Sequence, residues 1–147
     1  MYQQISFGTQ LVVCSQPVAA GTTPVKGTGV EMSDARGAEF FAHLGALTAT
    51  HVTYLKLQHS DTDVDGDYVD IPDARTANAE DADANKTLRI SIFKPLKRYV
   101  RPVLQRGTAN AVLNGMYCNL DTVYKPSEPH STQGRPTIYV NGDKVVE

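Results

Sequence analysis

The sequence predicts an all-β fold, a β-sandwich or a β-barrel, on three observations. Segments that alternate apolar and polar residues recur about every ten to fifteen residues, with turn signals between them. Thr, Val, Tyr, Gly and Pro are spread along the chain, whereas helix-forming residues are nowhere concentrated for long. The chain has 147 residues, which suits one domain with a substantial core.

The first 25 residues are expected to be rich in loops and to contain a strand or two. An apolar run from Ile5 to Val13 is the strand candidate. The stretch 17–24 begins and ends with proline and contains a glycine, so it is expected to hold no regular element. A short strand is predicted farther along, around Val30 and Met32.

The stretch RGAEFFAHLGAL, residues 36–47, is open to two interpretations. Its composition favours a strand over residues 39–44 that ends at Gly45. A helix over residues 34–47 is the alternative, because several apolar residues have helical spacing and a polar residue could cap it. The glycines inside this window disfavour the helix.

The stretch HVTYLKLQHS, residues 51–60, is the clearest strand, since apolar and polar residues alternate and many are β-branched or aromatic. The acidic residues 61–67 then form a turn into DYVDI, a strand that Pro72 is expected to end. Residues 74–87 contain no apolar residue larger than Ala. They should form a surface excursion or a short exposed helical turn and add nothing to the core.

Three further strands complete the body. LRISIF, residues 88–93, alternates like a half-buried strand, and KPLK turns the chain. RYVRPVLQRG, residues 98–107, follows, and Pro102 within it indicates an edge strand or a bulge. TANAVLNGMYCNL, residues 108–120, supplies the last strand. Residues 1–120 are therefore predicted to form a β-sandwich domain.

Residues 121–147 differ from the body in composition. Their first part, 121–136, contains three prolines and few apolar residues, which predicts an extended arm. The end, TIYVNGDKVVE, predicts a β-hairpin, because Asn141-Gly142 favours a two-residue type I′ turn. An isolated hairpin is marginal in water, so its apolar side chains need cover from this domain or from a neighbouring subunit. Those side chains are Ile138, Tyr139, Val140, Val145 and Val146.

The stretch HSDTDVDGDYVDIPD, residues 59–73, resembles half of a helix–loop–helix calcium site. Asp61, Asp63, Asp65 and Gly66 fit the first half of D-x-[DN]-x-[DN]-G-x5-E. Pro72 stands where the closing carboxylate is required, and the flanking segments read as strands, not helices. We therefore predict no metal ligand and interpret the stretch as a solvated acidic turn; an irregular calcium site in a β-loop is the alternative.

No catalytic residue and no cofactor are predicted. The four histidines lack the spacing of metal ligands, and no glycine-rich phosphate loop is present. Cys14 and Cys118 lie in apolar, strand-like surroundings, which is typical of buried reduced thiols; a disulfide between them is the less favoured alternative. We therefore expect a protein that is not an enzyme.

The charge of the chain argues against two classes of partner. A formal net charge of −2 and a pI near 6.1 give no basic footprint, so neither nucleic acid nor an anionic membrane is expected to bind. The sequence has no apolar run long enough to span a bilayer, and its first residues lack the pattern of a signal peptide.

Charge is nevertheless uneven along the chain. Lys94, Lys97, Arg98, Arg101 and Arg106 form a basic cluster that contrasts with the acidic stretch 61–83. Solvated faces of neighbouring strands would explain both. The functional alternative is a self-complementary surface through which copies of the chain pack in a fixed orientation. Arg98 and Arg101 are then candidate interface residues, together with the apolar side chains of the terminal hairpin.

Four stretches follow one another in a recognisable order: RGAEFFAHLGAL, YLKLQHSDTDVDGDYVDIPDA, LRISIFKPLKRYVRPVL and AVLNGMYCNL. In this order they resemble a family of small tailed-bacteriophage proteins that decorate or cement the capsid. The resemblance covers about residues 36–120. It implies a jelly-roll-like β-sandwich on the outside of a head lattice. It places 57–60 in the strand that enters the turn, 65–66 in the turn and 98–101 across the sheet. The polar insert 74–87 and the terminal hairpin depart from the family pattern.

The resemblance implies a structural virion protein, made in the host cytoplasm and located on the capsid exterior. Its partners would be the major capsid protein and itself, as a dimer or trimer. An arm that becomes ordered on a neighbour adds contact area across a joint, so residues 121–147 are expected to contact the shell or a sister copy. The alternative is a small β-sandwich carbohydrate- or ligand-binding module, with or without calcium at the acidic turn. The absence of Trp weakens the carbohydrate interpretation.

Overall fold

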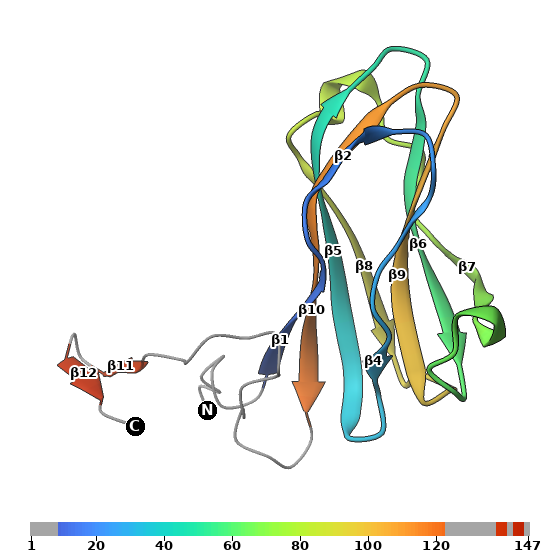
Figure 1. Cartoon of the computed structure of the whole chain (residues 1–147). Helices are drawn as coiled ribbons and strands as arrows, with labels where there is room; N and C mark the ends of the chain where they lie inside the picture. The colour runs from blue at the N-terminus through green and yellow to red at the C-terminus, as the bar shows by residue number, and fades with distance from the viewer. Residues whose placement is uncertain (1–8, 123–137, 141–142, 146–147) are drawn as a thin grey trace.

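The body of the protein is a β-sandwich. The computed structural model describes residues 9–122, 138–140 and 143–145, the last two segments without side chains. Two five-stranded antiparallel sheets lie face to face (Figure 1). The predicted all-β fold is therefore confirmed, and its strands form two sheets rather than one closed barrel.

Each sheet is built around two long inner strands. Sheet A has the order β1-β10-β5-β8, and β2 also pairs with β10. Its strands are β1 (Thr9–Ser15), β2 (Val18–Gly21), β5 (Ala35–Leu47), β8 (Thr87–Phe93) and β10 (Ala111–Thr122). Sheet B has the order β3-β9-β6-β7, and β4 also pairs with β9. Its strands are β3 (Val25–Lys26), β4 (Val30–Glu31), β6 (Val52–Ser60), β7 (Val69–Arg75) and β9 (Tyr99–Gly107).

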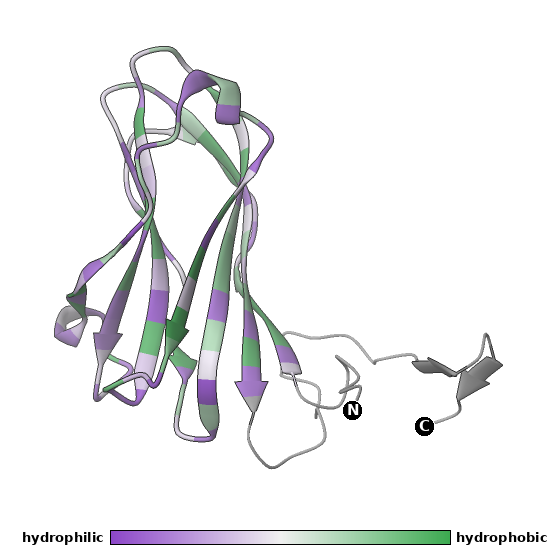
Figure 2. Cartoon of the chain, turned by 180° about the vertical axis from the view of Figure 1, so that it is seen from behind, coloured by the Kyte–Doolittle hydropathy of each residue, from purple (hydrophilic) through white to green (hydrophobic). Residues whose placement is uncertain are grey.

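The core lies between the sheets and is made by alternate residues of the long strands. Phe40 and Leu44 of sheet A and Leu55 and Leu57 of sheet B are all fully buried. Figure 2 shows hydrophobic and hydrophilic residues alternating along the strands, as expected when one face of a sheet meets the core. Each such side chain contributes roughly 1.5–3 kcal/mol by leaving water. The alternating segments 51–60 and 88–93 are strands, as predicted.

The strand β5 is longer than predicted, and the helical alternative for this region is wrong. It runs from Ala35 to Leu47 through both Gly37 and Gly45. A Cβ at Gly37 would lie 2.6 Å from the carbonyl oxygen of Ile92, and a Cβ at Gly45 would lie 2.7 Å from Cγ1 of Val112. These glycines therefore allow the neighbouring strands to approach β5 closely, and they do not end the strand.

The N-terminal segment is also more regular than predicted. The strand β2 occupies Val18–Gly21, within the stretch expected to hold no regular element. Its pairing with β10 overrides the weak local signal of a segment that lies between prolines. The predicted strand around Val30 and Met32 is present as the two-residue β4.

Pro102 lies in an inner strand, opposite a break in its neighbour. The strand β9 pairs with β6 on one side and with both β3 and β4 on the other. The Pro102 carbonyl accepts a hydrogen bond from the N–H of Gly27, which lies just after β3. The missing N–H of Pro102 thus falls where the chain passes from β3 to β4 and no continuous ladder exists. The predicted edge strand is wrong, although the local interruption that proline requires is present.

The segment 74–87 contributes to the core, contrary to the prediction. Ala79 is buried within the hydrophobic core, and its N–H donates to the carbonyl of Thr53. The strand β7 continues through Pro72 to Arg75, because at an edge strand the missing N–H of proline can face away from the ladder. A 3₁₀ turn, η2, spans Asp81–Asp83 and matches the predicted short helical turn.

The C-terminal region begins later than predicted. The strand β10 includes Asp121 and Thr122, so the predicted boundary of the arm at residue 121 is too early. The strands β11 (Ile138–Val140) and β12 (Asp143–Val145) pair as an antiparallel hairpin, with Ile138 opposite Val145. Residues 123–137, the expected Asn141-Gly142 turn, Val146 and the side chains of the hairpin lie outside the described part of the chain.

Arg106 closes the end of the sandwich at which β9 finishes. Its buried guanidinium donates to the carbonyl oxygens of Ala19 (2.8 Å), Thr23 (2.7 Å) and Ala111 (2.7 Å). Burial lowers the pKa of Arg106. Among the described residues no carboxylate lies within ion-pair distance of it. Arg106 therefore joins backbone segments inside the molecule and does not belong to an exposed basic cluster.

Candidate functional site

Two strongly exposed apolar side chains lie at the end of β8 and in the loop that connects it with β9. This loop takes the chain from sheet A to sheet B at the end of the sandwich opposite Arg106 (Figure 1). Lys94 begins it in the left-handed region, with φ of 53°, and its N–H donates to the carbonyl of Arg36 (2.8 Å). The turn leaves Phe93 70% exposed and Leu96 89% exposed. Exposed side chains of this size, only three positions apart in the sequence, indicate a contact surface.

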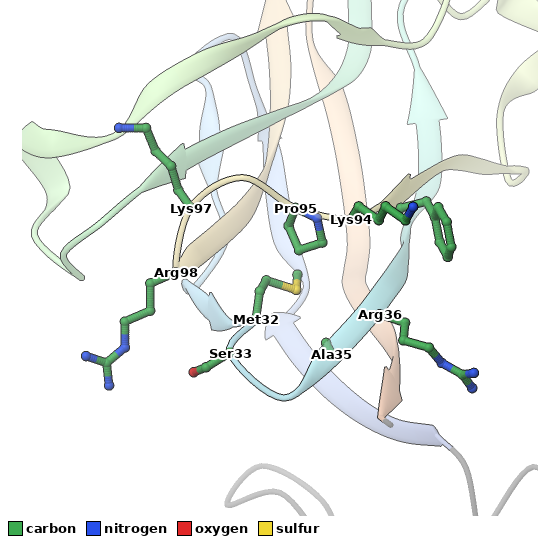
Figure 3. Close-up of a pocket in the computed structure, with 9 residues that line it drawn as sticks. Met32, Ser33, Ala35, Arg36, Lys94, Pro95, Lys97 and Arg98 are labelled. Carbon is green, nitrogen blue, oxygen red and sulfur yellow. The ribbon is translucent and has the colours of Figure 1, made fainter. Parts of the chain in front are cut away.

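A hollow of about 610 Å³ lies between this loop and the turn that connects β4 with β5. It is open to solvent, so it suits a chain segment of a partner better than an enclosed small molecule. Figure 3 shows Met32, Ala35 and Pro95 at its centre, with Lys97 and Arg98 on one side and Lys94 and Arg36 on the other. The lining residues are Met32, Ser33, Ala35, Arg36, Phe93, Lys94, Pro95, Lys97 and Arg98. We call these residues, with Leu96, the basic corner.

The rim of the basic corner carries four cations and no acidic lining residue. Three of the cations are held by carboxylates outside the hollow: Arg36 by Asp121 (3.2 Å), Lys97 by Asp61 (3.2 Å) and Arg98 by Glu31 (2.8 Å). Lys94 lies 5.6 Å from the centre of the Phe93 ring. In the described chain it has no carboxylate within ion-pair distance. The corner thus combines an apolar centre with a positive rim.

Arg98, one of the predicted interface residues, is bound to Glu31 at this rim. Its Nε and one terminal nitrogen both donate to the same oxygen of Glu31, at 3.0 and 2.8 Å. The Ser33 hydroxyl donates to that oxygen as well, at 2.8 Å. The hydrogen bond from Ser33, followed by that from Arg98, lowers the pKa of Glu31. Arg98 remains exposed, so its charge is available to a partner.

Arg101, the second predicted interface arginine, is not on the surface. Its side chain is only 7% exposed, and its guanidinium lies 4.1 Å from the centre of the Tyr68 ring. It donates to Asp65 (2.6 Å) and to the side-chain oxygen of Gln58 (2.9 Å). Its charge is therefore satisfied within sheet B and the turn next to it. The alternating pattern of apolar and polar residues could not predict this, because Asp65 is distant from Arg101 along the chain.

The acidic turn after β6 is tied to the body through separate partners. Asp61 pairs with Lys97, and Asp65 accepts from both Arg101 and Lys26, which lower its pKa in that order. Asp63 accepts from the Tyr68 hydroxyl at 2.6 Å, and Asp67 accepts from the Thr62 hydroxyl, also at 2.6 Å. Each of the four carboxylates, Asp61, Asp63, Asp65 and Asp67, therefore has donors of its own.

Because the four carboxylates are turned toward different donors, they do not converge on one point. A 3₁₀ turn, η1 (Asp65–Asp67), lies where a helix–loop–helix calcium site would have its binding loop. Within the described residues no group of three His, Cys, Asp or Glu side chains is placed to hold a metal ion. Two ion pairs, Lys97 with Asp61 and Arg101 with Asp65, thus join the basic and acidic stretches of the sequence inside one molecule.

One arrangement resembles a catalytic triad but is not accessible. The Nδ1 of His51 lies 3.0 Å from the Thr53 hydroxyl, and its Nε2 lies 3.3 Å from Asp81. Thr53 is fully buried, and neither hollow described here includes it. A nucleophile must reach a substrate, so this group serves to attach the segment around η2 to β6. This group could not be predicted from the sequence, because Asp81 lies in a polar insert far from His51 along the chain.

The remaining candidate reactive groups are also structural. Cys14 and Cys118 are free and buried, and burial raises the pKa of both thiols, that of Cys14 to about 12. This agrees with the predicted buried reduced thiols. His43 lies 3.0 Å from the Thr87 hydroxyl. Burial and then the charge of Lys97 lower the pKa of His59. His130 lies outside the described residues.

Two of the described tyrosines have rings that are covered by arginine side chains. The Arg75 guanidinium covers the ring of Tyr54 at 3.5 Å from its centre, beside a second hollow of about 200 Å³. Tyr68 is buried beneath Arg101. A sugar-binding aromatic needs a free ring face, so the carbohydrate alternative gains no support from these residues.

Comparison with family models and with curated proteins finds no match to this chain. In the described part of the chain, no helix is long and apolar enough to cross a membrane. The class that the fold and site define is therefore an antiparallel β-sandwich with an exposed apolar and cationic corner.

Proposed function

We propose that this chain is a structural virion protein that decorates the outside of a bacteriophage capsid and cements it by bridging major capsid protein subunits. The observation that carries the proposal is the basic corner, where Leu96 and Phe93 are exposed beside the rim cations. An apolar centre within a polar, charged rim is the usual arrangement of a protein–protein contact. The partner segment should offer apolar side chains together with carboxylates.

The strand order supports a jelly roll, the finer fold that goes with this proposal. The strands β1 and β2 share one side of β10, and β3 and β4 share one side of β9, so each pair behaves as one interrupted strand. Pairing is then nested along the chain. The interrupted strand β1/β2 pairs with β10, the interrupted strand β3/β4 pairs with β9, β5 pairs with β8, and β6 pairs with β7. The members of each pair lie in one sheet, and successive pairs alternate between the sheets, as in the jelly rolls of many capsid proteins.

The ends of the body also favour a bridging role. Thr9 of β1 pairs with Asp121 of β10, and Asp121 pairs with Arg36 at the rim of the basic corner. The segments before Thr9 and after Thr122 are thus attached beside the corner. A segment that adds contacts next to a docking surface raises the effective concentration of the second contact. We propose that residues 123–147 provide such a second contact, with the capsid or with a sister copy.

The proposal is tested by co-sedimentation with purified heads that lack the protein. Wild type should pellet with the heads, and Leu96→Ser should bind at least about tenfold more weakly, because the most exposed apolar side chain beside the hollow is lost. Val64→Ser is the matched control, since Val64 is 57% exposed but lies in the turn after β6, outside the basic corner. Failure of wild type to bind, or equal binding by Leu96→Ser and wild type, would contradict the proposal.

A truncation separates the two contacts. Removal of residues 123–147 leaves β10 whole and should reduce binding to heads without lowering the melting temperature of the body. If the truncated chain binds as wild type does, the segment has no role in attachment. Detection of the protein by mass spectrometry in purified virions, exposed to protease on intact particles, would place it on the capsid exterior.

A further inference from the structure

Of the sheet edges in the sandwich, β8 is the one without a visible safeguard against pairing. The edge strand β7 contains Pro72, a positive φ at Asp73 and a register shift against β6. The strands β3 and β4 are only two residues long each. The strand β1 has a register shift near Ser15. Proline, bulges and short edges are the devices by which proteins prevent unwanted strand pairing.

By contrast, β8 has no proline and pairs with β5 over seven consecutive residues without a shift. The Leu44 N–H donates to the Lys86 carbonyl, and the Lys94 N–H donates to the Arg36 carbonyl. These two bonds show which residues of β8 form hydrogen bonds with β5, because hydrogen-bonded and non-hydrogen-bonded pairs alternate along antiparallel strands. Leu88, Ile90 and Ile92 therefore direct their backbone groups toward β5. The backbone groups of Thr87, Arg89, Ser91 and Phe93 point to the open side. In the described chain β8 pairs only with β5.

We propose that the occupant of this edge is a second copy of the chain, paired through its own β8 in an antiparallel, two-fold arrangement centred on Ile90. This register places Arg89 opposite Ser91 of the second copy and Thr87 opposite Phe93 of the second copy. All four outward residues then form hydrogen-bonded pairs, and the two A sheets become one continuous sheet. Strand addition at an open edge is a recurrent mode of association.

Charge and pairing length select this register over its neighbours. A two-fold centred on Arg89 would place two arginines directly opposite each other, which is unfavourable. A centre at Ser91 would leave Thr87 without a partner. In the register centred on Ile90, Arg89 keeps its ion pair with Glu39 of its own β5 (3.0 Å) and meets only a hydroxyl across the interface.

The side chains on both faces also match. Leu88, Ile90 and Ile92 are partly buried against the core and remain half-open at the sheet edge. The pairing sets Ile90 against Ile90 and Leu88 against Ile92 of the second copy, which extends the core across the two-fold. On the other face Phe93, which is 70% exposed, gains a neighbour in Thr87 of the second copy. Matched apolar pairs across strands stabilise a sheet.

This dimer goes beyond the proposed function and does not depend on it. It gives each particle-binding unit two basic corners, because Phe93 ends β8 at the corner. Two corners in one rigid unit would make attachment to a repeating lattice bivalent. The tests below use only the purified protein, so their failure leaves the head-binding experiments unaffected.

The first test is the mass in solution, measured by light scattering or sedimentation over a range of concentrations. Wild type should approach twice 16.0 kDa. Ser91→Pro removes an N–H that points to the open side, so it spares the ladder with β5 and should weaken dimerisation on the order of thirtyfold or more. Ser91→Thr, the matched control, should dimerise as wild type does. A monomeric wild type at every concentration, or a Ser91→Pro protein that dimerises as well as wild type, would overturn the proposal.

Two further measurements stand if Ser91→Pro does not fold. Amide hydrogen exchange on wild type should slow at Thr87, Arg89, Ser91 and Phe93 as the dimer forms, and should not change at Ile90. Ile90→Cys should form an intermolecular disulfide under oxidation, since opposed residues of a non-hydrogen-bonded pair lie within disulfide distance. Dimers whose outward amides stay unprotected, or in which Ile90→Cys does not cross-link, use another surface and exclude this one.

Discussion

The two ends of the sandwich are closed by different chemistry, although β9 runs through both. At one end Arg106 is buried and its charge meets only backbone carbonyls. At the other end the cations are exposed, and each of Arg36, Lys97 and Arg98 holds a single carboxylate at the rim of a hollow. Among the described residues no buried side-chain nitrogen or oxygen lacks a hydrogen-bond partner, so the buried Arg106 is satisfied within the chain. The second end combines charge with exposed apolar side chains.

The difference shows how one residue type serves two purposes on a single strand and its preceding loop. A buried arginine that satisfies several carbonyls fixes the fold, because loss of its donors leaves acceptors without partners in a place that water reaches poorly. An exposed arginine in an ion pair contributes little to stability, so it can be retained for recognition. Substitutions at the two ends should therefore separate stability from binding.

The largest expected effect is the loss of Arg106. Arg106→Met removes three charge-assisted hydrogen bonds to carbonyls and should lower the free energy of unfolding by roughly 3–4 kcal/mol. Urea denaturation followed by circular dichroism measures it. Arg89→Met is the matched control, because Arg89 is an exposed arginine, and it should cost less than about 0.5 kcal/mol. Equal losses in the two variants would remove the distinction between the ends.

Next in size is Arg101, which lies between the two ends and is buried against Tyr68. Arg101→Met should destabilise the protein by about 2 kcal/mol, less than Arg106→Met, because its partner Asp65 is exposed and can be solvated when left alone. The same denaturation experiment ranks the two variants. If Arg101→Met abolished head binding without any loss of stability, Arg101 would have the interface role that its burial argues against.

A smaller effect is expected from acid. The pKa of Asp65 is lowered in the folded protein, so its stabilising contribution is present above the ordinary carboxyl pKa near 4 and is lost as pH falls through the lower folded value. Asp65→Asn should therefore flatten the dependence of the urea midpoint on pH below about 5. An unchanged acid profile in Asp65→Asn would show that other carboxylates, such as Asp70, dominate.

The smallest expected effect on stability belongs to the basic corner. Leu96→Ser and Phe93→Ser replace exposed side chains, so each should change the free energy of unfolding by less than about 0.5 kcal/mol. The same variants should be the most damaging for attachment to heads. A large loss of stability in Leu96→Ser would show that Leu96 packs within the chain, and the contrast between the ends would fail.

Much of the fold could be predicted from the sequence because most strands have one face in the core. The period of two in 51–60 and 88–93 follows directly from that geometry. The extent of β5 could not be predicted, since Gly37 and Gly45 act through the close approach of Ile92 and Val112, which are distant in sequence. The edge strand predicted from Pro102 is wrong for the same reason. Proline is tolerated in this inner strand because its missing N–H lies opposite the break between β3 and β4, which are distant in sequence.

The site was harder to predict than the fold. Arg98 is exposed, whereas Arg101 and Arg106, which follow it closely in the sequence, are buried, and the sequence has nothing that distinguishes exposed from buried guanidinium groups. Leu96 was overlooked because KPLK reads as a simple turn. One available signal was the large apolar residue between lysines in that turn, where a polar residue would suffice for solubility.

The nested pairing has a consequence for how the protein reaches its native state. The strand β10 is the last of the body, yet it lies inside sheet A, between β1 and β5. Until residues 111–122 arrive, the first strand has no ladder to join, and the inner edge of β5 is open. Folds that depend on such distant pairings form in milliseconds to seconds rather than microseconds. During synthesis the chain should therefore remain exposed to proteases and aggregation until its final strand closes the sheet.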